Sequence, residues 1–329
     1  MMLNFAIYGC GVIAKTHAMA LEQVEGAVLT ACADLNRASA EAFASKWGIR
    51  CVNCWQDLVT DNEIDVVCIC TPSGTHGLLA VEALNAGKHV VVEKPMAINS
   101  AQCQQIIEAA ENAKGKITVI SQLRTSADII RAKKLLSSGA LGKILLCQLH
   151  MCYYRPESYY DGSWRGTKEM DGGGALMNQG IHGIDILHYL MGPVKQLRSV
   201  VRTLMHDIQV EDTAVAALEF ENSALGVITA STATHPGFDR EIRIYGTNGA
   251  LEFREDKLVR LILDGAEQSC APYTSAGMAG SNTVMDSKGH ARQIDAFVRA
   301  ISGEETNYID QYQGKLAVDL IQQIYRESI

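Results

Sequence analysis

The chain has 329 residues, of which 47% are hydrophobic and 20% are charged, a composition typical of a soluble globular protein. This length exceeds what one compact core usually holds, so two domains are expected. A formal net charge of -8 argues against nucleic acid or an anionic membrane as a partner. The first residues contain neither a basic leader nor a long apolar run, so we expect no signal peptide and a cytoplasmic location.

The first twenty residues predict a dinucleotide site. Residues 3–8 form an apolar run that predicts a buried strand, and a helical pattern over residues 13–24 follows it. Between the two, Gly9 supplies a tight turn and Gly11 lets the backbone approach a pyrophosphate without a Cβ atom. The start of the helix, with Val12 and Ile13, offers unpaired N–H groups to the phosphates.

A second strand, residues 28–33, ends at Asp34, about twenty residues after the glycine turn. A carboxylate at this position accepts hydrogen bonds from both ribose hydroxyls of NAD and repels the extra phosphate of NADP. Arg37 supports the alternative, because a guanidinium just beyond the carboxylate can accept a 2′-phosphate. NAD is the preferred interpretation.

Helices and strands alternate up to residue 122, which predicts a parallel sheet. We expect helices over residues 36–47, 77–86 and 101–113, and strands over residues 64–70, 89–92 and 117–122. The strand 64–70 brings Thr71 and Pro72 to the carboxyl edge of the sheet, where ligands bind. His76 starts the next helix and either contacts the cofactor or caps and packs that helix.

The strand 89–92 is followed by Glu93, Lys94 and Pro95. A lysine at the carboxyl end of a strand, held by a proline that fixes the backbone, is a cation at the mouth of the nucleotide crevice. The alternative is a surface ion pair between Glu93 and Lys94. Adjacent residues of a strand point to opposite faces, which disfavours that pairing.

Beyond Arg124 the pattern changes. A helix over residues 128–138 and a strand over 143–154 lead to a long polar and aromatic loop that contains Trp164 and Arg165. A helix that Asp171 caps is expected to run to Leu190. At about 100° per residue, Asn178, His182 and Asp185 share one face of that helix, which indicates a wet pocket rather than a buried network.

The remaining pattern predicts an antiparallel sheet and two closing helices. Strands are expected over residues 196–205, 213–220, 224–233, 240–245 and 250–253, and helices over 289–301 and 311–325. Residues 265–280 show no clear pattern, and His290 either reaches the cleft or caps its helix. Cys51 and Cys54 have the spacing of a metal-binding pair, but no second pair accompanies them, so we expect free thiols and no metal.

Together, the glycine turn from Gly9 to His17, the loop from Thr71 to His76, the Glu93-Lys94-Pro95 turn and the 172–185 helix resemble the Gfo/Idh/MocA oxidoreductases. The resemblance implies a doubly wound Rossmann domain over residues 1–122. An α+β domain with an open, mainly antiparallel sheet is expected over residues 123–329, with a C-terminal helix that packs back on the first domain. In this family the open sheet often joins subunits, so a homodimer or homotetramer is expected.

The resemblance also implies roles for site residues. Lys94 corresponds to the catalytic lysine, often followed by a cis proline, and His182 to the usual proton acceptor. Inositol dehydrogenase-like members carry an aspartate where this chain has Asn178. Together with Trp164-Arg165-Gly166 and residues 210–213, this makes the chain more similar to the UDP-N-acetyl-2-amino-2-deoxyglucuronate dehydrogenase branch.

The expected reaction is NAD-dependent oxidation of a secondary hydroxyl on a sugar or nucleotide sugar. His182 takes the hydroxyl proton, Lys94 stabilises the alkoxide, Asn178 orients the substrate or His182, and Asp185 fixes the imidazole tautomer. The substrate phosphates of a nucleotide sugar would be met by Arg124, Arg155, Arg165 and Lys168. The expected cofactor contacts are Gly9, Gly11, Val12, Ile13, Asp34, Arg37, Thr71, Pro72, His76, Glu93, Lys94, Gln122, Trp164 and Arg165.

Three alternatives remain open from the sequence. In the first, the substrate is a free polyol such as inositol. In the second, it is another compound such as a dihydrodiol or an imine, because the fold alone does not select the substrate. The third is a non-catalytic NAD(H)-sensing module, which has little need for Lys94 and His182 together.

Overall fold

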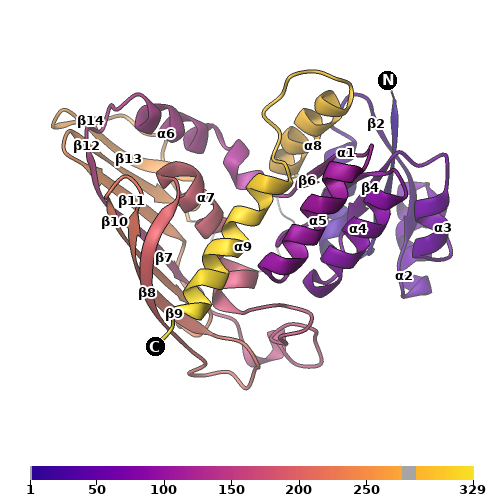
Figure 1. The fold of residues 1–329 in the computed structure, drawn as a ribbon, viewed down its shortest axis with the longest axis horizontal. Helices are drawn as coiled ribbons and strands as arrows, with labels where there is room; N and C mark the ends of the chain where they lie inside the picture. Colours follow the sequence, from indigo (N-terminus) through magenta and orange to yellow (C-terminus); the bar gives the residue numbers. More distant parts are fainter. Residues whose placement is uncertain (1, 276–286) are drawn as a thin grey trace. The chain divides into compact units, whose positions relative to one another are not determined.

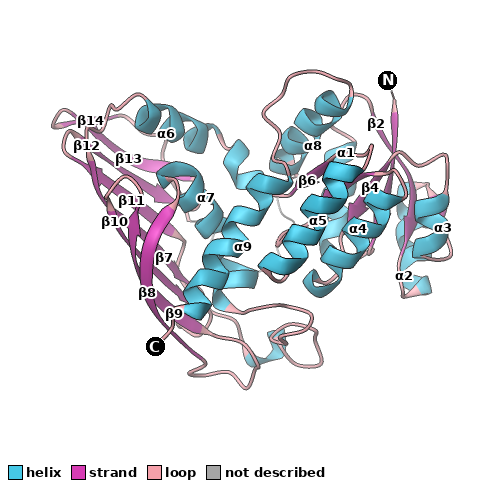
Figure 2. Cartoon of the chain, viewed as in Figure 1, coloured by secondary structure: helices cyan, strands magenta, loops and turns pink. Residues whose placement is uncertain are grey.

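The computed structural model describes residues 2–275 and 287–329. Contacts between Cα atoms divide the chain into two compact units, Met1–Gln122 with Val284–Lys315, and Leu123–Thr283 with Leu316–Ile329 (Figures 1 and 2). The second unit is therefore not one uninterrupted stretch from residue 123 to the C-terminus. Helix α8, Lys288–Ile301, returns to the first unit and packs on α1, Val12–Leu21.

The first unit contains a parallel sheet of six strands in the order β3-β2-β1-β4-β5-β6. The order reverses between β1 and β4, which is the point at which open α/β sheets bind their ligands. This confirms the parallel sheet expected from the sequence. The strands are β1 Leu3–Tyr8, β2 Ala27–Ala33, β3 Arg50–Cys51, β4 Val66–Ile69, β5 His89–Val92 and β6 Ile117–Val119.

The connecting helices begin and end at residues suited to those positions. The Asn36 side chain accepts a hydrogen bond from Ser39 N at the start of α2, and Gly48 ends this helix with a φ of 65°. The β3 strand and the six-residue α3 helix were not expected, because elements this short show no periodicity. The helices are α2 Arg37–Trp47, α3 Trp55–Thr60, α4 His76–Asn85 and α5 Ser100–Asn112.

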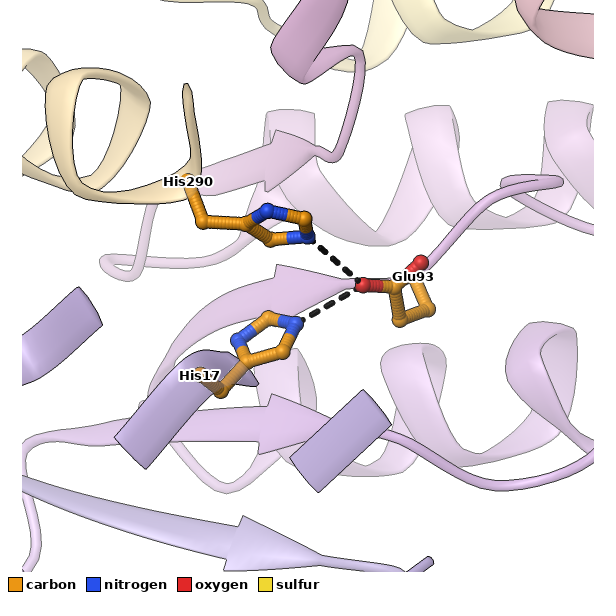
Figure 3. A group of neighbouring side chains, drawn as sticks. All are labelled: His17, Glu93 and His290. Atoms are coloured by element: carbon orange, nitrogen blue, oxygen red, sulfur yellow. Dashed lines mark hydrogen bonds and ion pairs between the residues drawn. The ribbon is translucent and has the colours of Figure 1, made fainter. Parts of the chain in front are cut away.

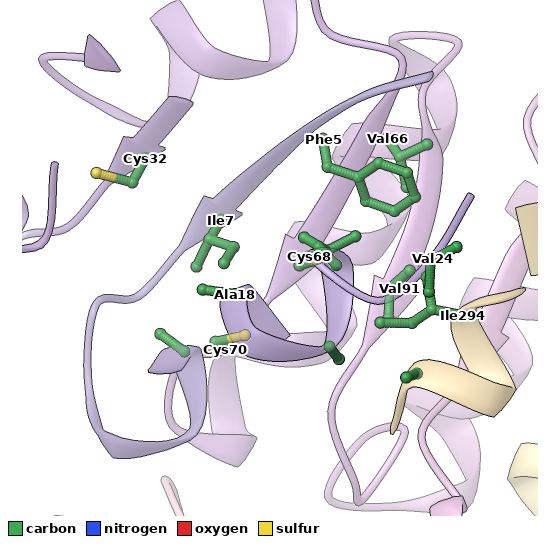
Figure 4. Close-up of a cluster of buried hydrophobic side chains, with 14 of the residues drawn as sticks. Phe5, Ile7, Ala18, Val24, Cys32, Val66, Cys68, Cys70, Val91 and Ile294 are labelled. Carbon is green, nitrogen blue, oxygen red and sulfur yellow. The ribbon is translucent and has the colours of Figure 1, made fainter. Parts of the chain in front are cut away.

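The core of the first unit consists of side chains from the central strands and from two helices (Figure 4). Phe5, Cys68 and Val91 are fully buried, and they share one cluster with Ile294 and Phe297 of α8. Burial of these two side chains accounts for the return of α8 to this unit. The ten cysteines all lie among the described residues and form no disulfide there.

The second unit contains a sheet of eight strands in the order β14-β13-β12-β11-β7-β10-β9-β8. All neighbouring pairs are antiparallel except β7 with β10, so the expectation of a mainly antiparallel sheet is confirmed. The short β13–β14 extension was not expected. The strands are β7 Ile144–Cys152, β8 Val194–Arg202, β9 Thr213–Phe220, β10 Leu225–Ser231, β11 Glu241–Gly246, β12 Gly249–Arg254, β13 Lys257–Leu263 and β14 Ala266–Gln268.

The two faces of this sheet differ. Along β7, Cys147, Leu149 and Met151 are fully buried, and this strand packs on α7, Ile181–Met191. Helix α6, Ala127–Ser137, packs on α7 and β13, and α9, Gln311–Arg326, ends the chain. Alternating residues on the opposite face leave Val215 and Leu225 exposed. In the described part of the chain, every helix is too short or too polar to span a bilayer.

Candidate active site

The glycine turn after β1 has the geometry that a dinucleotide requires. Gly9 has a φ of 93°, and a Cβ atom there would lie 2.7 Å from the Cys70 carbonyl oxygen, so only glycine fits. Gly11 has no neighbouring atom within 4 Å of such a Cβ position. No described side chain caps α1, and Val12 at its first position is 71% exposed. The N–H groups of this helix end are therefore open to a phosphate.

The carboxylate of Asp34 is fixed at the end of β2. Its Oδ2 atom accepts a hydrogen bond from Cys10 N at 2.7 Å, and its Oδ1 atom accepts one from Asn36 N at 2.7 Å. Each oxygen keeps a lone pair that can accept a ribose hydroxyl. Arg37 instead donates to the Glu41 carboxylate at 2.7 Å and to Asn53 at 3.0 Å. Both observations fit NAD better than NADP.

His76 has a structural position in the loop that follows β4. Its ring is buried, with Nδ1 2.7 Å from the Pro95 carbonyl oxygen and Nε2 2.9 Å from the Thr71 carbonyl oxygen. Burial lowers the pKa of this imidazole. His76 therefore ties the Thr71 loop to the turn after β5, and Thr71 and Pro72 remain half-buried at the edge of the sheet. Of the two alternatives for His76, this geometry favours packing.

Lys94 lies directly after β5, where the Lys94–Pro95 peptide bond is cis, as the resemblance implied. The Lys94 backbone N–H donates to Glu93 Oε2 at 3.1 Å. The other carboxylate oxygen of Glu93 faces His17 and His290, which are both fully buried (Figure 3). His290 is thus part of a buried cluster in the first unit. Gln122 is also buried in this unit, against Gly289.

The helix expected from Asp171 to Leu190 is observed only in part, because it starts at Ala175 and its first turn is not α-helical. A π-helical turn, Ala175–Gly180, precedes α7, and Asp171 caps neither. Only glycine fits directly before this turn, because a Cβ atom on Gly174 would lie 1.9 Å from the Glu211 carbonyl oxygen. The Glu211 carboxylate accepts hydrogen bonds from Gly174 N at 3.0 Å and Leu176 N at 2.8 Å. A period of 3.6 residues does not extend through this turn.

Asn178 lies in the π-helical turn, whereas His182 and Asp185 lie in α7, so a spacing of 100° per residue does not relate the three side chains. Asp171, predicted as a cap, accepts hydrogen bonds from Gly166 N and from the Asn178 side chain. His182 is half-buried in the first turn of α7.

Two residues that the sequence analysis did not select complete the surroundings of Asn178. The Gln179 amide donates to Asn178 Oδ1 and to the Tyr159 hydroxyl, both at 2.8 Å. Gln179 stands beside Asn178 in the sequence, and Tyr159 belongs to the aromatic loop already noted. Neither position has a spacing that would single it out, because the contact depends on how the loop folds.

The predicted phosphate-binding cations separate into two groups. The Arg155 and Arg165 guanidiniums lie 5.3 Å and 4.6 Å from the centre of the Tyr159 ring, and Arg155 also donates to Gln179. Arg165 contacts the Trp164 ring at 5.2 Å and forms no ion pair with a described carboxylate. Lys168 is exposed.

Arg124 forms the other group. It is buried, donates through two nitrogens to the Asp185 carboxylate, and lies 5.2 Å from the Tyr189 ring centre. Asp185 therefore neutralises Arg124. Both of its oxygens accept hydrogen bonds from Arg124, so the geometry does not favour the expected role of Asp185 in fixing the His182 tautomer. Because breaking a buried ion pair is costly, Arg124 is a poor candidate for a substrate phosphate.

Comparison with known proteins supports this reading of the two units. Residues 3–121 match the family described as "Oxidoreductase family, NAD-binding Rossmann fold", and residues 129–252 match the "GFO/IDH/MocA C-terminal domain". A levoglucosan dehydrogenase from Pseudarthrobacter phenanthrenivorans is 26% identical over 78% of this chain and 74% of its own length. A myo-inositol 2-dehydrogenase from Thermotoga maritima is 24% identical over 96% of this chain and 93% of its own.

Among solved structures, the WlbA dehydrogenase from Bordetella pertussis in complex with NADH and UDP-GlcNAcA is similar to this chain. It is 30% identical with a TM-score of 0.88, and the match covers 100% of this chain and 97% of the other. A WlbA dehydrogenase from Chromobacterium violaceum, also with NADH and UDP-GlcNAcA, is 30% identical with a TM-score of 0.88, covering 99% and 94% of the two chains.

Proposed function

Because this chain belongs to the Gfo/Idh/MocA family of NAD-binding oxidoreductases, we propose that it oxidises a secondary hydroxyl of a nucleotide sugar. The nicotinamide, when bound, supplies the hydride chemistry. The observation that carries the choice of a nucleotide sugar is the pair of guanidiniums of Arg155 and Arg165 on the Tyr159 ring. Arg155 is also hydrogen-bonded to Gln179, which in turn donates to Asn178.

The protein has to orient the sugar and to move one proton. We assign the proton acceptor to His182, because an imidazole has a pKa of about 6.5 and changes its protonation state near neutral pH. The Lys94 ammonium stabilises the developing alkoxide, a role for which a cation at the carboxyl edge of the sheet is suited. Asn178 orients the substrate through an amide that Asp171 and Gln179 hold from two sides.

Arg155 and Arg165 are assigned to the diphosphate of the substrate. A guanidinium donates two parallel hydrogen bonds to phosphate oxygens, and its flat face stays on an aromatic ring while it does so. Arg165 has no carboxylate partner in the described part of the chain, so it does not have to leave an ion pair when it binds an anion. Arg124 is excluded from this set because Asp185 holds its guanidinium.

The test compares kcat/KM for a UDP-linked sugar and for the corresponding free sugar. We expect the UDP-linked sugar to be preferred by at least about a hundredfold, the effect of two charge-assisted contacts. Arg165→Gln should lower kcat/KM for the UDP-linked sugar about tenfold and leave the free sugar unchanged. Arg198→Gln is the matched control, since Arg198 is an exposed arginine paired with Glu327 on the surface.

Two outcomes contradict the proposal in different ways. Equal kcat/KM values for the two substrates, with efficient turnover of a free polyol, would show that the diphosphate is not recognised. Tight NADH binding with no NADH formation from any sugar or sugar nucleotide would favour the sensing module instead.

We further propose that the exposed face of the second unit's sheet joins copies of this chain. Val200, Val215 and Leu225 are 41%, 46% and 57% exposed on neighbouring strands of this face. Val200 and Val215 lie opposite each other in the register of β8 and β9, and an exposed apolar patch is typical of protein interfaces. Light scattering should find a dimer or tetramer that Val215→Glu dissociates, whereas Leu78→Glu, on exposed α4 in the first unit, should leave it intact. A monomeric wild-type protein would contradict this proposal.

A further inference from the structure

A closed cluster of three ionisable side chains lies inside the first unit (Figure 3). The Nε2 atoms of His17 and His290 lie 2.8 Å and 3.3 Å from the same oxygen of Glu93, Oε1. The three residues come from α1, the end of β5 and α8, and all are buried. The second oxygen of Glu93 accepts the Lys94 backbone N–H.

The geometry fixes the charge of this cluster. The Nδ1 atoms of His17 and His290 are buried and have no hydrogen-bond partner among the described residues. A protonated imidazole would leave a buried N–H without an acceptor at this position, so each ring carries its single proton on Nε2 and is neutral. Burial lowers the pKa of His17 accordingly. Burial alone would raise the pKa of Glu93, but hydrogen bonds from the two histidines hold it well below its usual value. The cluster therefore carries one net negative charge.

Two histidines and a carboxylate can also bind zinc, and the 3.3 Å separation of His290 Nε2 and Glu93 Oε1 is compatible with it. The His17 distance and the Nδ1 atoms favour hydrogen bonds. With zinc–ligand bonds of about 2.0–2.1 Å, tetrahedral ligands lie about 3.3 Å apart. The 2.8 Å separation of His17 Nε2 and Glu93 Oε1 is shorter than this and typical of a hydrogen bond. Zinc-bound histidines also donate their second N–H to an acceptor, and neither Nδ1 atom has one in the described part of the chain.

The position of this charge in the sheet indicates which part of the cofactor it acts on. A dinucleotide spans the crevice with one nucleotide on each half of the sheet. Asp34, directly after β2, marks the half that takes the adenosine ribose, so the nicotinamide nucleotide belongs to the half formed by β4, β5 and β6. Glu93 directly follows β5. The Glu93 carboxylate also acts on Cys70, directly after β4. Burial is the main cause that raises the pKa of this thiol, and the charges of Cys68 and Glu93 raise it further.

We propose that Glu93, held as a buried anion by His17 and His290, makes the protein favour NAD⁺ over NADH. The oxidised nicotinamide ring carries a positive charge and the reduced ring is neutral, so a fixed negative charge in this half stabilises only the oxidised form. The proposal concerns the cofactor alone and does not depend on which sugar is oxidised. His17 and His290 are positioning residues, because they act through Glu93.

The test measures the Kd of NAD⁺ and of NADH for each variant by fluorescence titration at pH 8. Glu93→Gln keeps the shape of the side chain and removes its charge. We expect it to raise Kd(NAD⁺)/Kd(NADH) about tenfold, the effect of two unit charges about 12 Å apart at an effective dielectric constant of about 20. Glu108→Gln, which removes a carboxylate from the exposed surface of α5, is the matched control. It should leave the ratio and both affinities within about twofold of the wild type.

A second variant covers the case in which Glu93→Gln does not fold. His290→Lys keeps Glu93 and adds a cation beside it, so the ratio should rise about three- to tenfold. A ratio that stays unchanged in whichever of these two variants folds, with both affinities reduced in parallel, would show that the cluster is only structural. Zinc bound at one equivalent in the purified wild-type protein would also overturn the proposal.

Discussion

The buried cluster around Glu93 and the chain of polar groups around Asn178 use similar residue types in different ways. In the first unit, Glu93 is fully enclosed and both its oxygens accept hydrogen bonds. In the second unit, Asn178, Gln179 and Tyr159 are only half-buried, and the network ends at guanidiniums stacked on a ring.

The difference follows from the cost of burying charge. A buried carboxylate is tolerated only when its hydrogen-bond partners are fixed. The resulting site is rigid and is suited to binding one kind of cofactor. Half-buried amides and stacked guanidiniums can exchange their partners for a ligand at little cost. The first arrangement is suited to NAD, and the second is suited to substrates that vary between relatives.

The largest expected effect is on kcat, for a variant of Lys94 in the first unit. Lys94→Met should lower kcat about a hundredfold or more, because the alkoxide loses its cation, while the Kd of NADH changes less than about threefold. Lys195→Met, at an exposed ion pair with Glu219, serves as the control and should leave both constants unchanged. Near-normal turnover of the Lys94 variant, measured by NADH absorbance, would remove this residue from the reaction.

Alanine substitutions of the two glycines in the dinucleotide turn should affect different properties, stability for Gly9 and NADH affinity for Gly11. Gly9→Ala places a Cβ atom 2.7 Å from the Cys70 carbonyl oxygen at a φ of 93°, so it should lower the free energy of unfolding by about 2 kcal/mol or more. Gly11→Ala meets no atom within 4 Å and should keep the wild-type Tm, yet weaken NADH binding about tenfold because its methyl group meets the phosphates. Unchanged NADH affinity in Gly11→Ala would contradict the assigned phosphate position.

A smaller, pH-dependent effect is expected in the second unit, at Asp212. Its carboxylate accepts hydrogen bonds from Leu204 N, Met205 N and His206 N at 2.9 Å, 2.8 Å and 3.0 Å. Burial alone would raise the pKa of Asp212, but these N–H groups lower it overall. Its contribution to stability is therefore complete above the unfolded pKa of about 3.9 and is lost as the pH falls through the lower folded value.

Urea unfolding tests this sign. At pH 7, Asp212→Asn should reduce the free energy of unfolding by about 2 kcal/mol, the cost of weakened hydrogen bonds to a charged group. The difference from the wild type should shrink at the lowest pH at which both proteins still fold. A constant difference across the whole pH range would show that the charge of Asp212 is not what stabilises this turn.

The sequence predicted the cofactor half of the molecule better than the substrate half. The elements around Gly9, Asp34 and Lys94 follow from local patterns, because each motif is continuous in the chain and ends a strand. The return of α8 was not predicted, since the contact of Ile294 with the first unit links segments far apart in sequence.

The second unit was harder to predict because its site depends on one irregular turn. A π-helical turn, whose first residues donate to the Glu211 carboxylate, precedes α7, so the assumption of 100° per residue fails between Asn178 and His182. The pairing of Arg124 with Asp185 likewise depends on tertiary structure. No spacing in the sequence predicts either feature.

A double-variant cycle in steady-state turnover tests the central claim most directly. If Lys94 and His182 act on the same hydroxyl, Lys94→Met, His182→Asn and the double variant should all turn over a UDP-linked sugar at similarly low rates, because residues that act as a unit are not additive. A double variant slowed by the full product of the two single effects, or a single variant with near-normal turnover, would contradict the account.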